Sequence, residues 1–384
     1  MPNSNQQDVY TCLALMWTDS NWGWLDRMPS SGALQAMLRE TFTEEEALAL
    51  CAVPMSDVPL DLVTLDEIAP NSRLPRERLE EILDGIVARG HLYCRTAADG
   101  KKAYTVPRLG FGFPQIYFWK GEPDSLTEKI AILQRDPEVS QATMDLYTGS
   151  ETKPYRYIPT SEAIDPQWQN VYPSETIEKV IMRASRLALA HCPCRVRYRM
   201  VKGEGCGHST DVCIKLDELA ELVINAGLAK EISHEEALAT IKKADDEGLV
   251  HFTDNTAEGI KHICNCCGDA CWNVRPIRRR QMPRDVIMAT YFLRETSDAD
   301  CIACGECVKI CPVAAVTIQN DVATVDRDWC IGCGICVPRC QTQAIKLVEK
   351  ENKPLQSTGF TELYARISSA RASASTAKSE SGQA

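Results

Sequence analysis

The cysteines between positions 301 and 340 are arranged in two runs of identical spacing, C-x₂-C-x₂-C-x₃-C. In such a run the first three thiolates bind one [4Fe–4S] cluster from a single tight loop, and the fourth thiolate binds the cluster of the other run. We therefore expect two clusters that exchange their fourth ligands. The expected ligands of the first cluster are Cys301, Cys304, Cys307 and Cys340, and those of the second are Cys330, Cys333, Cys336 and Cys311.

The segment that holds both runs, residues 297–350, resembles the bacterial two-cluster ferredoxins. The resemblance implies a 2[4Fe–4S] ferredoxin fold for this segment. Pro312 follows the fourth cysteine of the first run, whereas Gln341 takes the equivalent place in the second run, where a second proline is expected. This departure concerns loop rigidity and reduction potential at one cluster rather than ligation. Two zinc ribbons are the alternative, but zinc sites prefer paired C-x₂-C knuckles.

Eight further cysteines lie in the middle of the chain, in two groups separated by predicted helices over residues 216–225 and 233–247. The groups are Cys192, Cys194, Cys206 and Cys213, and Cys264, Cys266, Cys267 and Cys271. If the fold brings the groups together, the most economical interpretation of the thiolate-rich pocket is another iron–sulfur site. Four thiolates suffice for one [4Fe–4S] cluster and eight could hold two, and the spacing does not divide them.

Two other interpretations of these middle cysteines stay open. Zinc is the first, because His191, His208 and His262 lie nearby in the sequence and zinc binds both thiolate and imidazole. A catalytic thiol is the second.

Two basic stretches flank the middle cysteines, although the chain has a net charge of −11. Their members are Arg195, Arg197, Arg199 and Lys202, and Arg275, Arg278, Arg279, Arg280 and Arg284. We expect them to compensate a negatively charged thiolate cluster or to dock an acidic redox partner. Binding of an anionic substrate is a third possibility.

The N-terminal elements follow the order of a winged-helix module. Capping boxes at Thr43 with Glu46 and at Thr64 with Glu67 predict two helix starts. Pro75 opens a third predicted helix, which Gly90 ends. Its apolar stripe consists of Leu79, Ile82, Leu83, Ile86 and Val87. Two short runs, 91–95 and 102–106, form a predicted hairpin through an Asp-Gly turn.

The third of these helices is a poor candidate for entering a DNA groove. Its arginines are Arg76, Arg78 and Arg89, against the acids Glu77, Glu80, Glu81 and Asp84. A recognition helix should carry an excess of positive charge. We therefore expect a structural or protein-binding module rather than a DNA-binding one. Trp17, Trp22 and Trp24 are expected to pack against this module, with a docking surface as the alternative.

The remaining segments are expected to be less regular. Residues 107–173 are dense in proline, glycine and aromatics and predict an extended crossing with one helix near 126–133. Apolar spacing from Ile177 to Leu187 predicts a helix that ends before Cys192. A last helix is predicted over 361–367, and the Ser/Ala-rich tail from Ser368 to Ala384 is expected to be disordered.

The composition indicates a multidomain protein of a reducing compartment. A chain of 384 residues with 44% hydrophobic residues can bury more than one core. No apolar run reaches the roughly 18 residues of a membrane span, and the N-terminus lacks the features of a signal peptide. We therefore expect the 19 cysteines to bind metal in the cytoplasm rather than to form disulfides. The acidic net charge also makes nucleic-acid binding unexpected.

These expectations combine into an α+β chain with successive domains. Their limits are 1–107 for the winged-helix-like domain with its N-terminal extension, 108–173 for the connecting region, 174–296 for a helical cysteine-rich domain, 297–350 for the ferredoxin domain and 351–384 for a largely disordered tail.

The winged-helix-like part, the Cys-x-Cys-Arg segment at 192–195, the Cys-Asn-Cys-Cys segment at 264–267 and the ferredoxin segment together resemble the multi-cluster ferredoxin proteins of anaerobes. The resemblance implies electron transfer and cluster ligation by the middle cysteines. We therefore expect an electron carrier, or an electron-transferring subunit of a larger oxidoreductase, with at least three [4Fe–4S] clusters and a redox partner protein. One alternative is an iron–sulfur-dependent transcriptional regulator that uses the N-terminal module. The other is a reductase whose middle cluster binds a substrate.

Overall fold

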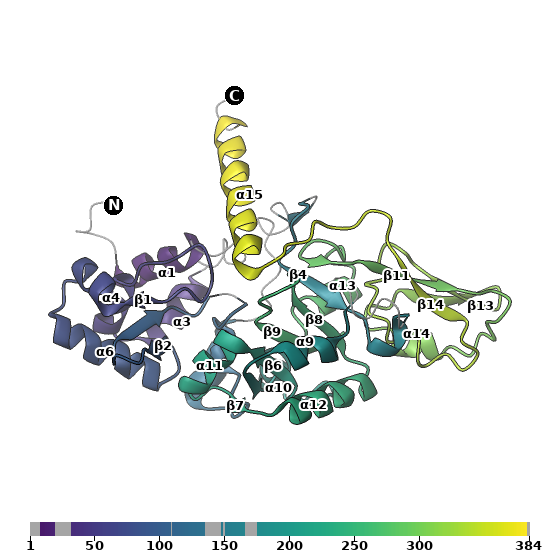
Figure 1. Cartoon of the computed structure of the whole chain (residues 1–384), viewed down its shortest axis with the longest axis horizontal. Helices are drawn as coiled ribbons and strands as arrows, with labels where there is room; N and C mark the ends of the chain where they lie inside the picture. Colours follow the sequence, from purple (N-terminus) through teal and green to yellow (C-terminus); the bar gives the residue numbers. More distant parts are fainter. Residues whose placement is uncertain are drawn as a thin grey trace.

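The computed structural model describes residues 8–19, 32–108, 110–134, 147–148, 150–165 and 175–381. Helices and sheets are mixed along the chain, as expected for an α+β protein. The N-terminal, middle and C-terminal parts follow one another along the long axis of the molecule (Figure 1). Trp22, Trp24 and the last three residues of the tail lie outside the described residues.

The N-terminal part packs its helices on a small antiparallel sheet of order β1-β3-β2. Both predicted capping boxes are present, at Thr43 with Glu46 and at Thr64 with Glu67. The elements are α1 (Val9–Asp19), α3 (Ala33–Thr41), α4 (Glu44–Cys51), β1 (Val63–Thr64), α5 (Leu65–Ile68), η1 (Ala69–Asn71), α6 (Arg76–Ala88), β2 (Tyr93–Thr96) and β3 (Lys102–Thr105). The predicted helices and hairpin therefore lie where the sequence placed them.

Trp17 anchors α1 in the core of this part. Its side chain is 1% exposed, and its ring lies 5.0 Å from that of Phe113 and 6.2 Å from that of Phe42. The indole Nε1–H donates to the carbonyl of Pro107 at 3.1 Å. For Trp17, packing rather than docking is therefore confirmed.

The segment after the hairpin contributes more to the fold than an extended crossing would. It contains η2 (Gln115–Tyr117), the predicted helix α7 (Ser125–Leu133), β4 (Tyr155–Ile158) and η3 (Ser161–Ala163). All four residues of β4 are buried, and the strand pairs antiparallel with β8 (Val250–Asp254). Because both faces of β4 are covered, its sequence lacks the alternation that would have identified a strand.

A seven-stranded sheet of order β10-β4-β8-β9-β6-β5-β7 forms the middle of the molecule. The prediction of a helical middle domain is therefore wrong. The other strands are β5 (Leu187–Ala190), β6 (Cys213–Leu216), β7 (Lys230–Glu231), β9 (His262–Cys266) and β10 (Met288–Ala289). All neighbours are antiparallel except β10 and β4, which are parallel.

The helices of the middle part are α9 (Ile177–Arg183), α10 (Pro193–Lys202), α11 (Asp217–Asn225), α12 (His234–Asp246) and α13 (Val274–Arg278). The predicted helix from Ile177 to Leu187 is too long, because Ala184 takes extended backbone and Leu187 begins β5. The backbone N–H and hydroxyl of Ser185 both donate to the carboxylate of Asp217 at 2.7 Å, which holds the chain out of the helix. The run after Ser185 is largely buried on both faces, so its apolar spacing could not separate helix from strand.

The C-terminal part consists of β11 (Phe292–Thr296), α14 (Glu306–Ile310), β12 (Val316–Gln319), β13 (Val322–Val325) and β14 (Ile345–Glu349). β11 pairs antiparallel with β14, and β12 pairs antiparallel with β13. The two strands β11 and β14 therefore bring the start and the end of this part together.

The tail continues as α15 (Phe360–Ser381), which projects from the body of the molecule (Figure 1). The prediction that residues from Ser368 onward are disordered is wrong for the described part of the tail. Phe360, Leu363, Tyr364 and Ile367 are buried and fix the first turns. Alanine, arginine and lysine in the rest have high helix propensity, so an anchored first turn can be extended without further packing. Among the described residues, no helix combines the length and apolar character that crossing a bilayer requires.

Candidate iron–sulfur sites

The first site in the C-terminal part is a pocket lined by Cys301, Cys304, Cys307 and Cys340. Cys301 and Cys304 come from the loop that leads into α14, Cys307 lies in the first turn of this helix, and Gly305 takes a left-handed φ of 77° between them. Cys340 comes from the second cysteine run, and Cys311 does not line the pocket. This is the exchanged grouping that the spacing predicts.

The second site gathers Cys311, Cys330, Cys333 and Cys336. Burial raises the pKa of Cys336 to about 12, and the nearby Cys330 and Cys311 raise it as well. Burial also raises the pKa of Cys333 and of Cys311, each within electrostatic reach of the others. Buried thiols of this kind ionise only when a cation or metal compensates the charge. The second grouping therefore also suits metal ligation.

Backbone N–H groups point at sulfurs of both sites. Ala323 N–H donates to Cys301 Sγ at 3.3 Å, and Ala315 N–H donates to Cys311 Sγ at 3.2 Å. Burial opposes ionisation of Cys340, but the Thr342 hydroxyl and neighbouring N–H groups lower its pKa overall. Such donors stabilise thiolates and tune the potential of an iron–sulfur cluster.

Arg294 is a buried cation that serves both sites, and sequence reasoning missed it. Its side chain lines the pocket of the first site, and its charge partly offsets the burial that raises the pKa of Cys311 and Cys336 in the second. The residue is 1% exposed, and no carboxylate forms an ion pair with it among the described residues. An arginine within the apolar run that forms β11 was the feature of the sequence that could have identified Arg294.

In the middle part, six thiols form one continuous cluster: Cys192, Cys194, Cys213, Cys264, Cys266 and Cys271. Neighbouring thiols of this cluster shift one another's pKa, in the order Cys192, Cys194, Cys271, Cys266, Cys264 and Cys213. Pairing of β6 with both β5 and β9 brings the early and late cysteines together. The expectation that the fold joins the two groups is therefore met for these six.

Lys215 lies beside this six-thiol cluster and was also missed. Its side chain is buried, and Nζ donates to Cys213 Sγ at 3.2 Å while lying 4.5 Å from the centre of the Trp119 ring. Burial opposes the charge of Lys215, but the neighbouring Cys213 and Cys264 raise its pKa overall. The neighbouring Cys213 and Cys266, together with the positive charge of Lys215, lower the pKa of Cys264 to about 6. A lysine within the buried strand β6, two residues from Cys213, was the signal in the sequence.

The other two middle thiols, Cys206 and Cys267, form a separate pair with their Sγ atoms 3.8 Å apart. Arg195 lies between this pair and the six-thiol cluster. It is 2% exposed, donates to the carbonyl of Asn265 at 3.1 Å and lies within electrostatic reach of Cys192, Cys267 and Cys266. Interactions between the thiols thus group six of them and pair the other two, although Cys192 and Cys194 also pack in the same buried cluster as Cys206 and Cys267.

The second basic stretch binds the C-terminal part of this same chain. Arg280 donates to the carbonyls of Val313 and Ala314 at 2.9 and 2.8 Å and lies 4.3 Å from the Trp329 ring centre. Arg284 donates to the carbonyl of Cys330 at 2.6 Å. The expectation that this stretch compensates a thiolate cluster or docks a partner stays a prediction, and Arg284 lies next to Cys330 of the second C-terminal site.

In the first stretch, Arg197 and Arg199 donate to the carbonyls of Gln134 and Gly121. Among these members, Arg195 is the one that faces thiols.

The middle and C-terminal sites touch through two short loops. A side-chain carbon at Gly268 would lie 2.2 Å from the carbonyl oxygen of Pro312, so the two backbones are in direct contact. Gly268 follows Cys267, and Pro312 follows Cys311. The middle thiols are therefore adjacent to the second site of the C-terminal part.

The family model of the 4Fe-4S dicluster domain matches residues 300–345. The matched residues contain both cysteine runs and both sites described above. The match and the thiol geometry identify an iron–sulfur protein with a ferredoxin-type domain and [4Fe–4S] clusters in its C-terminal region. No curated protein and no solved structure was found to match this chain.

Proposed function

We propose that this chain transfers single electrons through two [4Fe–4S] clusters in the C-terminal part and at least one more in the six-thiol cluster. Such clusters supply one-electron chemistry, whereas the protein positions them and tunes their potentials. The C-terminal ligands are the two exchanged sets of four cysteines. The middle ligands come from the six-thiol cluster, which offers more thiolates than one [4Fe–4S] cluster needs.

Buried positive charge supports the middle site. Lys215 and Arg195 lie against the thiols without an ion pair to a carboxylate in the described ranges. A buried cation is costly unless negative charge lies next to it. Ionised, metal-bound thiolates provide that charge, whereas neutral thiols do not.

The contact of Gly268 with Pro312 carries the electron-transfer proposal. Gly268 lies two residues after Cys266 of the six-thiol cluster, and Pro312 follows Cys311 of the second C-terminal set, so the contact supports a short path between these two sets of ligands. At the other end, Cys304 is exposed and Ile302 is 62% exposed. We infer that a redox partner protein docks at this loop and that the chain acts as a carrier or as a subunit of a larger oxidoreductase.

The ion pairs of α6 disfavour the regulator alternative. Arg76 pairs with Asp66, Arg78 pairs with Glu45 and Glu81, and Arg89 pairs with Glu46. The hairpin strand β2 packs against α11 of the middle part, where Arg95 pairs with Glu221 at 2.8 Å. Neither the helix nor the hairpin is thus left free for a DNA groove. We propose that the N-terminal module has a structural role.

All 19 cysteines are free thiols, which suits the reducing cytoplasm that we propose for this protein. The reductase alternative requires an iron with an open coordination position. The surplus of thiols around the middle site argues against such a position.

The proposed function is tested on the full chain purified without oxygen. Iron and sulfide analysis should give more of both than two [4Fe–4S] clusters contain, and Cys194→Ala should remove the excess. An EPR-monitored redox titration should then show a signal that this variant lacks. If the wild-type chain contains only the iron of the two C-terminal clusters, the middle cluster does not exist.

A further inference from the structure

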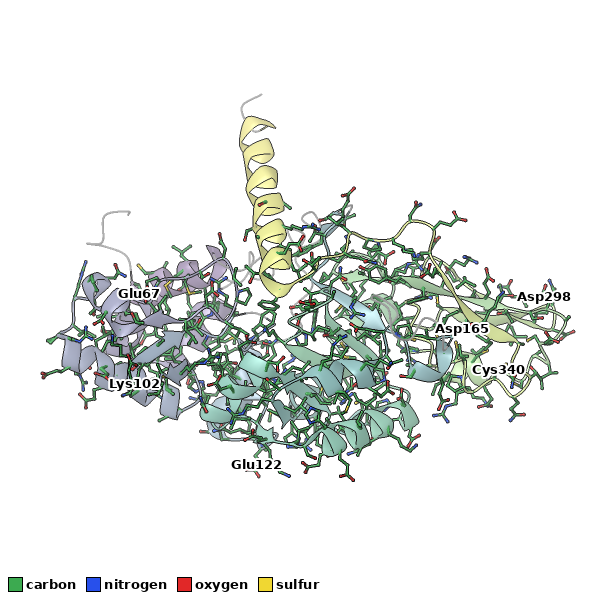
Figure 2. The ribbon with its side chains drawn as sticks, viewed as in Figure 1. Glu67, Lys102, Glu122, Asp165, Asp298 and Cys340 are labelled. Atoms are coloured by element: carbon green, nitrogen blue, oxygen red, sulfur yellow. The ribbon has the colours of Figure 1, made fainter. Side chains whose placement is uncertain are left out.

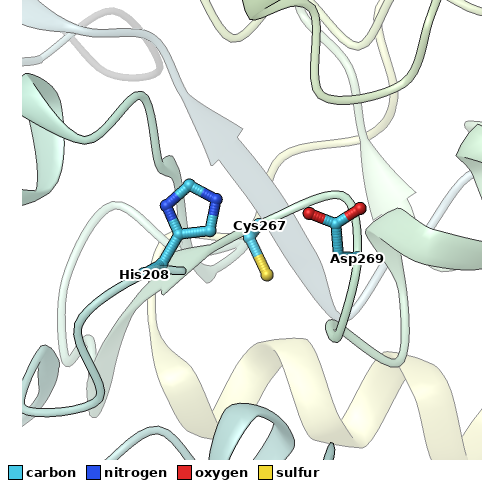
Figure 3. Close-up of side chains that lie close together, drawn as sticks. All are labelled: His208, Cys267 and Asp269. Carbon is cyan, nitrogen blue, oxygen red and sulfur yellow. The ribbon is translucent and has the colours of Figure 1, made fainter. Parts of the chain in front are cut away.

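We propose that Cys206, His208, Cys267 and Asp269 bind a single zinc ion, separate from the iron–sulfur clusters. One ligand atom each of His208, Cys267 and Asp269 lies within 4.8 Å of the others. Figure 3 shows these three side chains close together. Cys206 Sγ lies outside this compact group of three but 3.8 Å from Cys267 Sγ, and it would supply the fourth ligand. The set combines thiolate, imidazole and carboxylate, which are all common zinc ligands.

The distance between the two sulfurs fits one shared ion. Zinc–sulfur bonds of about 2.3 Å at a tetrahedral angle separate two sulfurs by about 3.8 Å. Cys206 and Cys267 have this separation. Thiolates that bind different irons of a [4Fe–4S] cluster stand farther apart, because each iron carries one of them.

Two segments far apart in the sequence supply the four ligands. Cys206 and His208 lie in the loop after α10, where Gly203 and Gly207 take left-handed φ values of 78° and 82° and reverse the chain. Cys267 and Asp269 follow the end of β9. Besides burial, the groups that most affect the pKa of Cys206 are His208, Cys267 and Arg195. No member of the six-thiol cluster is among them.

The surroundings of the site orient and balance these ligands. The Glu247 carboxylate lies 3.8 Å from His208 Nδ1 and accepts hydrogen bonds from the N–H of Ser209 at 2.8 Å and from its hydroxyl. A carboxylate behind a metal-binding histidine is a common arrangement that fixes the ring. The positive charge of Arg195 lies within electrostatic reach of Cys267. Cys267 is buried while the His208 side chain is 28% exposed, so the ion has access from solvent.

Four protein ligands make a closed site, which is typical of structural zinc. The ion would fasten the loop after α10 to the turn that carries Gly268. Gly268 contacts Pro312, so the zinc site would also support the joint between the middle and C-terminal parts. This proposal does not depend on a middle cluster, because it uses none of the six clustered thiols.

The test is metal analysis of the full chain, purified without oxygen and incubated with Zn²⁺ before desalting. We expect one zinc per chain, and X-ray absorption at the zinc edge should show two sulfur ligands and two nitrogen or oxygen ligands. Cys206→Ser, His208→Ala and the conservative Asp269→Asn should each lose zinc and keep all iron. His234→Ala and Cys51→Ser are matched controls, since both residues lie away from the site, and they should keep zinc.

Three outcomes would overturn the proposal. The first is a wild-type chain that holds no zinc after this treatment. The second is an all-sulfur zinc environment that the His208 and Asp269 changes leave intact. The third is loss of iron, instead of zinc, in the Cys206 variant, which would make Cys206 a cluster ligand. The Cys194→Ala variant separates this proposal from that of the middle [4Fe–4S] cluster. It should lose the middle cluster and keep zinc.

Discussion

Three buried cations, Arg195, Lys215 and Arg294, lie against cysteine thiols rather than carboxylates in the described part of the chain. Each is nearly inaccessible to water, where an isolated charge is strongly disfavoured. Their positions therefore indicate where the molecule holds negative charge.

Lys215→Met should lower the reduction potential of the middle cluster. The change keeps the apolar bulk but removes a positive charge that favours the reduced, more negative state. At an effective dielectric of about 20 and a separation of roughly 6 Å, this is worth about 2–3 kcal/mol, or on the order of 100 mV. An EPR-monitored redox titration measures the shift. Lys242→Met, whose side chain is 77% exposed, is the control. An unchanged potential would mean that Lys215 does not face a cluster.

Asp254 should make the protein less stable as the pH rises. Burial raises its pKa to about 7, although the N–H of Lys261, which donates to it at 2.7 Å, acts to lower it. Unfolding restores the ordinary pKa of about 4, so the folded state binds more protons between about pH 4 and pH 7. The loss of stability across this window is on the order of 4 kcal/mol.

Asp254→Asn should flatten this pH dependence, which thermal unfolding followed by circular dichroism at several pH values would measure. The exposed Asp99→Asn is the control. A variant with the same pH dependence as the wild type would contradict the assignment to Asp254.

The residue-scale features differ in how far the sequence revealed them. The eight C-terminal cysteines were predictable because local loop geometry fixes their spacing. The grouping of the middle thiols was not, because it depends on the pairing of β6 with β9, as of Ile214 with Ile263, residues far apart in the sequence. Lys215 and Arg294 were missed because their roles depend on which strand face is buried.

At the scale of elements, the loop that leads to β14 supplies Cys340 to the site built by the loop before α14. Cys340→Ala should therefore damage the cluster bound by Cys301, Cys304 and Cys307 and spare the cluster of its own run. Mössbauer spectra of the Cys340→Ala chain, compared with those of variants that retain only one of the two C-terminal clusters, would identify the lost cluster. Cys94→Ala, in the N-terminal part, is the control. Selective loss of the other cluster would show that the ligands are not exchanged.

Gly268→Ala should separate the two loops that join the middle and C-terminal parts. The added carbon would lie 2.2 Å from the Pro312 carbonyl oxygen, and backbone atoms can relieve such a contact only by moving. We expect a loss of about 1–3 kcal/mol in stability and slower electron transfer between the parts, measured by thermal unfolding and by pulse radiolysis. Gly205→Ala is the matched control, because its nearest neighbour lies 3.9 Å away. Equal behaviour of the two variants would mean that this contact is not part of the route.

Elements with local signals were predicted well. The capping boxes of α4, α5 and α12 fixed their starts, because the capping hydrogen bonds form within four residues. The strands β4 and β5 were missed because burial on both faces removes the alternation on which a strand prediction depends. The helical tail was missed because its first turn is held by tertiary packing of Phe360 and Tyr364 on Phe111.

On the scale of the whole molecule, the C-terminal cysteine sites lie at one end and the ion-paired N-terminal module lies at the other. Figure 2 shows Cys340 in the C-terminal part and Lys102 in the N-terminal part at the opposite end. Lys102 of the hairpin forms ion pairs with Glu80 and Asp84 of α6, so its charge is neutralised within the N-terminal part. The order of the parts was predictable from the sequence. The large sheet that connects them was not, because its strands come from three separate stretches of the chain.

The pairing of β11 with β14 means that the chain enters and leaves the C-terminal part side by side. On its return, Leu355 and Ser357 form bridges with Thr152 and Thr256 of the middle part. A segment held at both ends and clamped by Arg280 and Arg284 has no hinge about which to swing. Electrons should therefore tunnel between fixed sites without waiting for a diffusive motion. The rate of transfer within the chain should then be independent of solvent viscosity, and pulse radiolysis in increasing glycerol would show a constant rate where a swinging domain would slow in proportion.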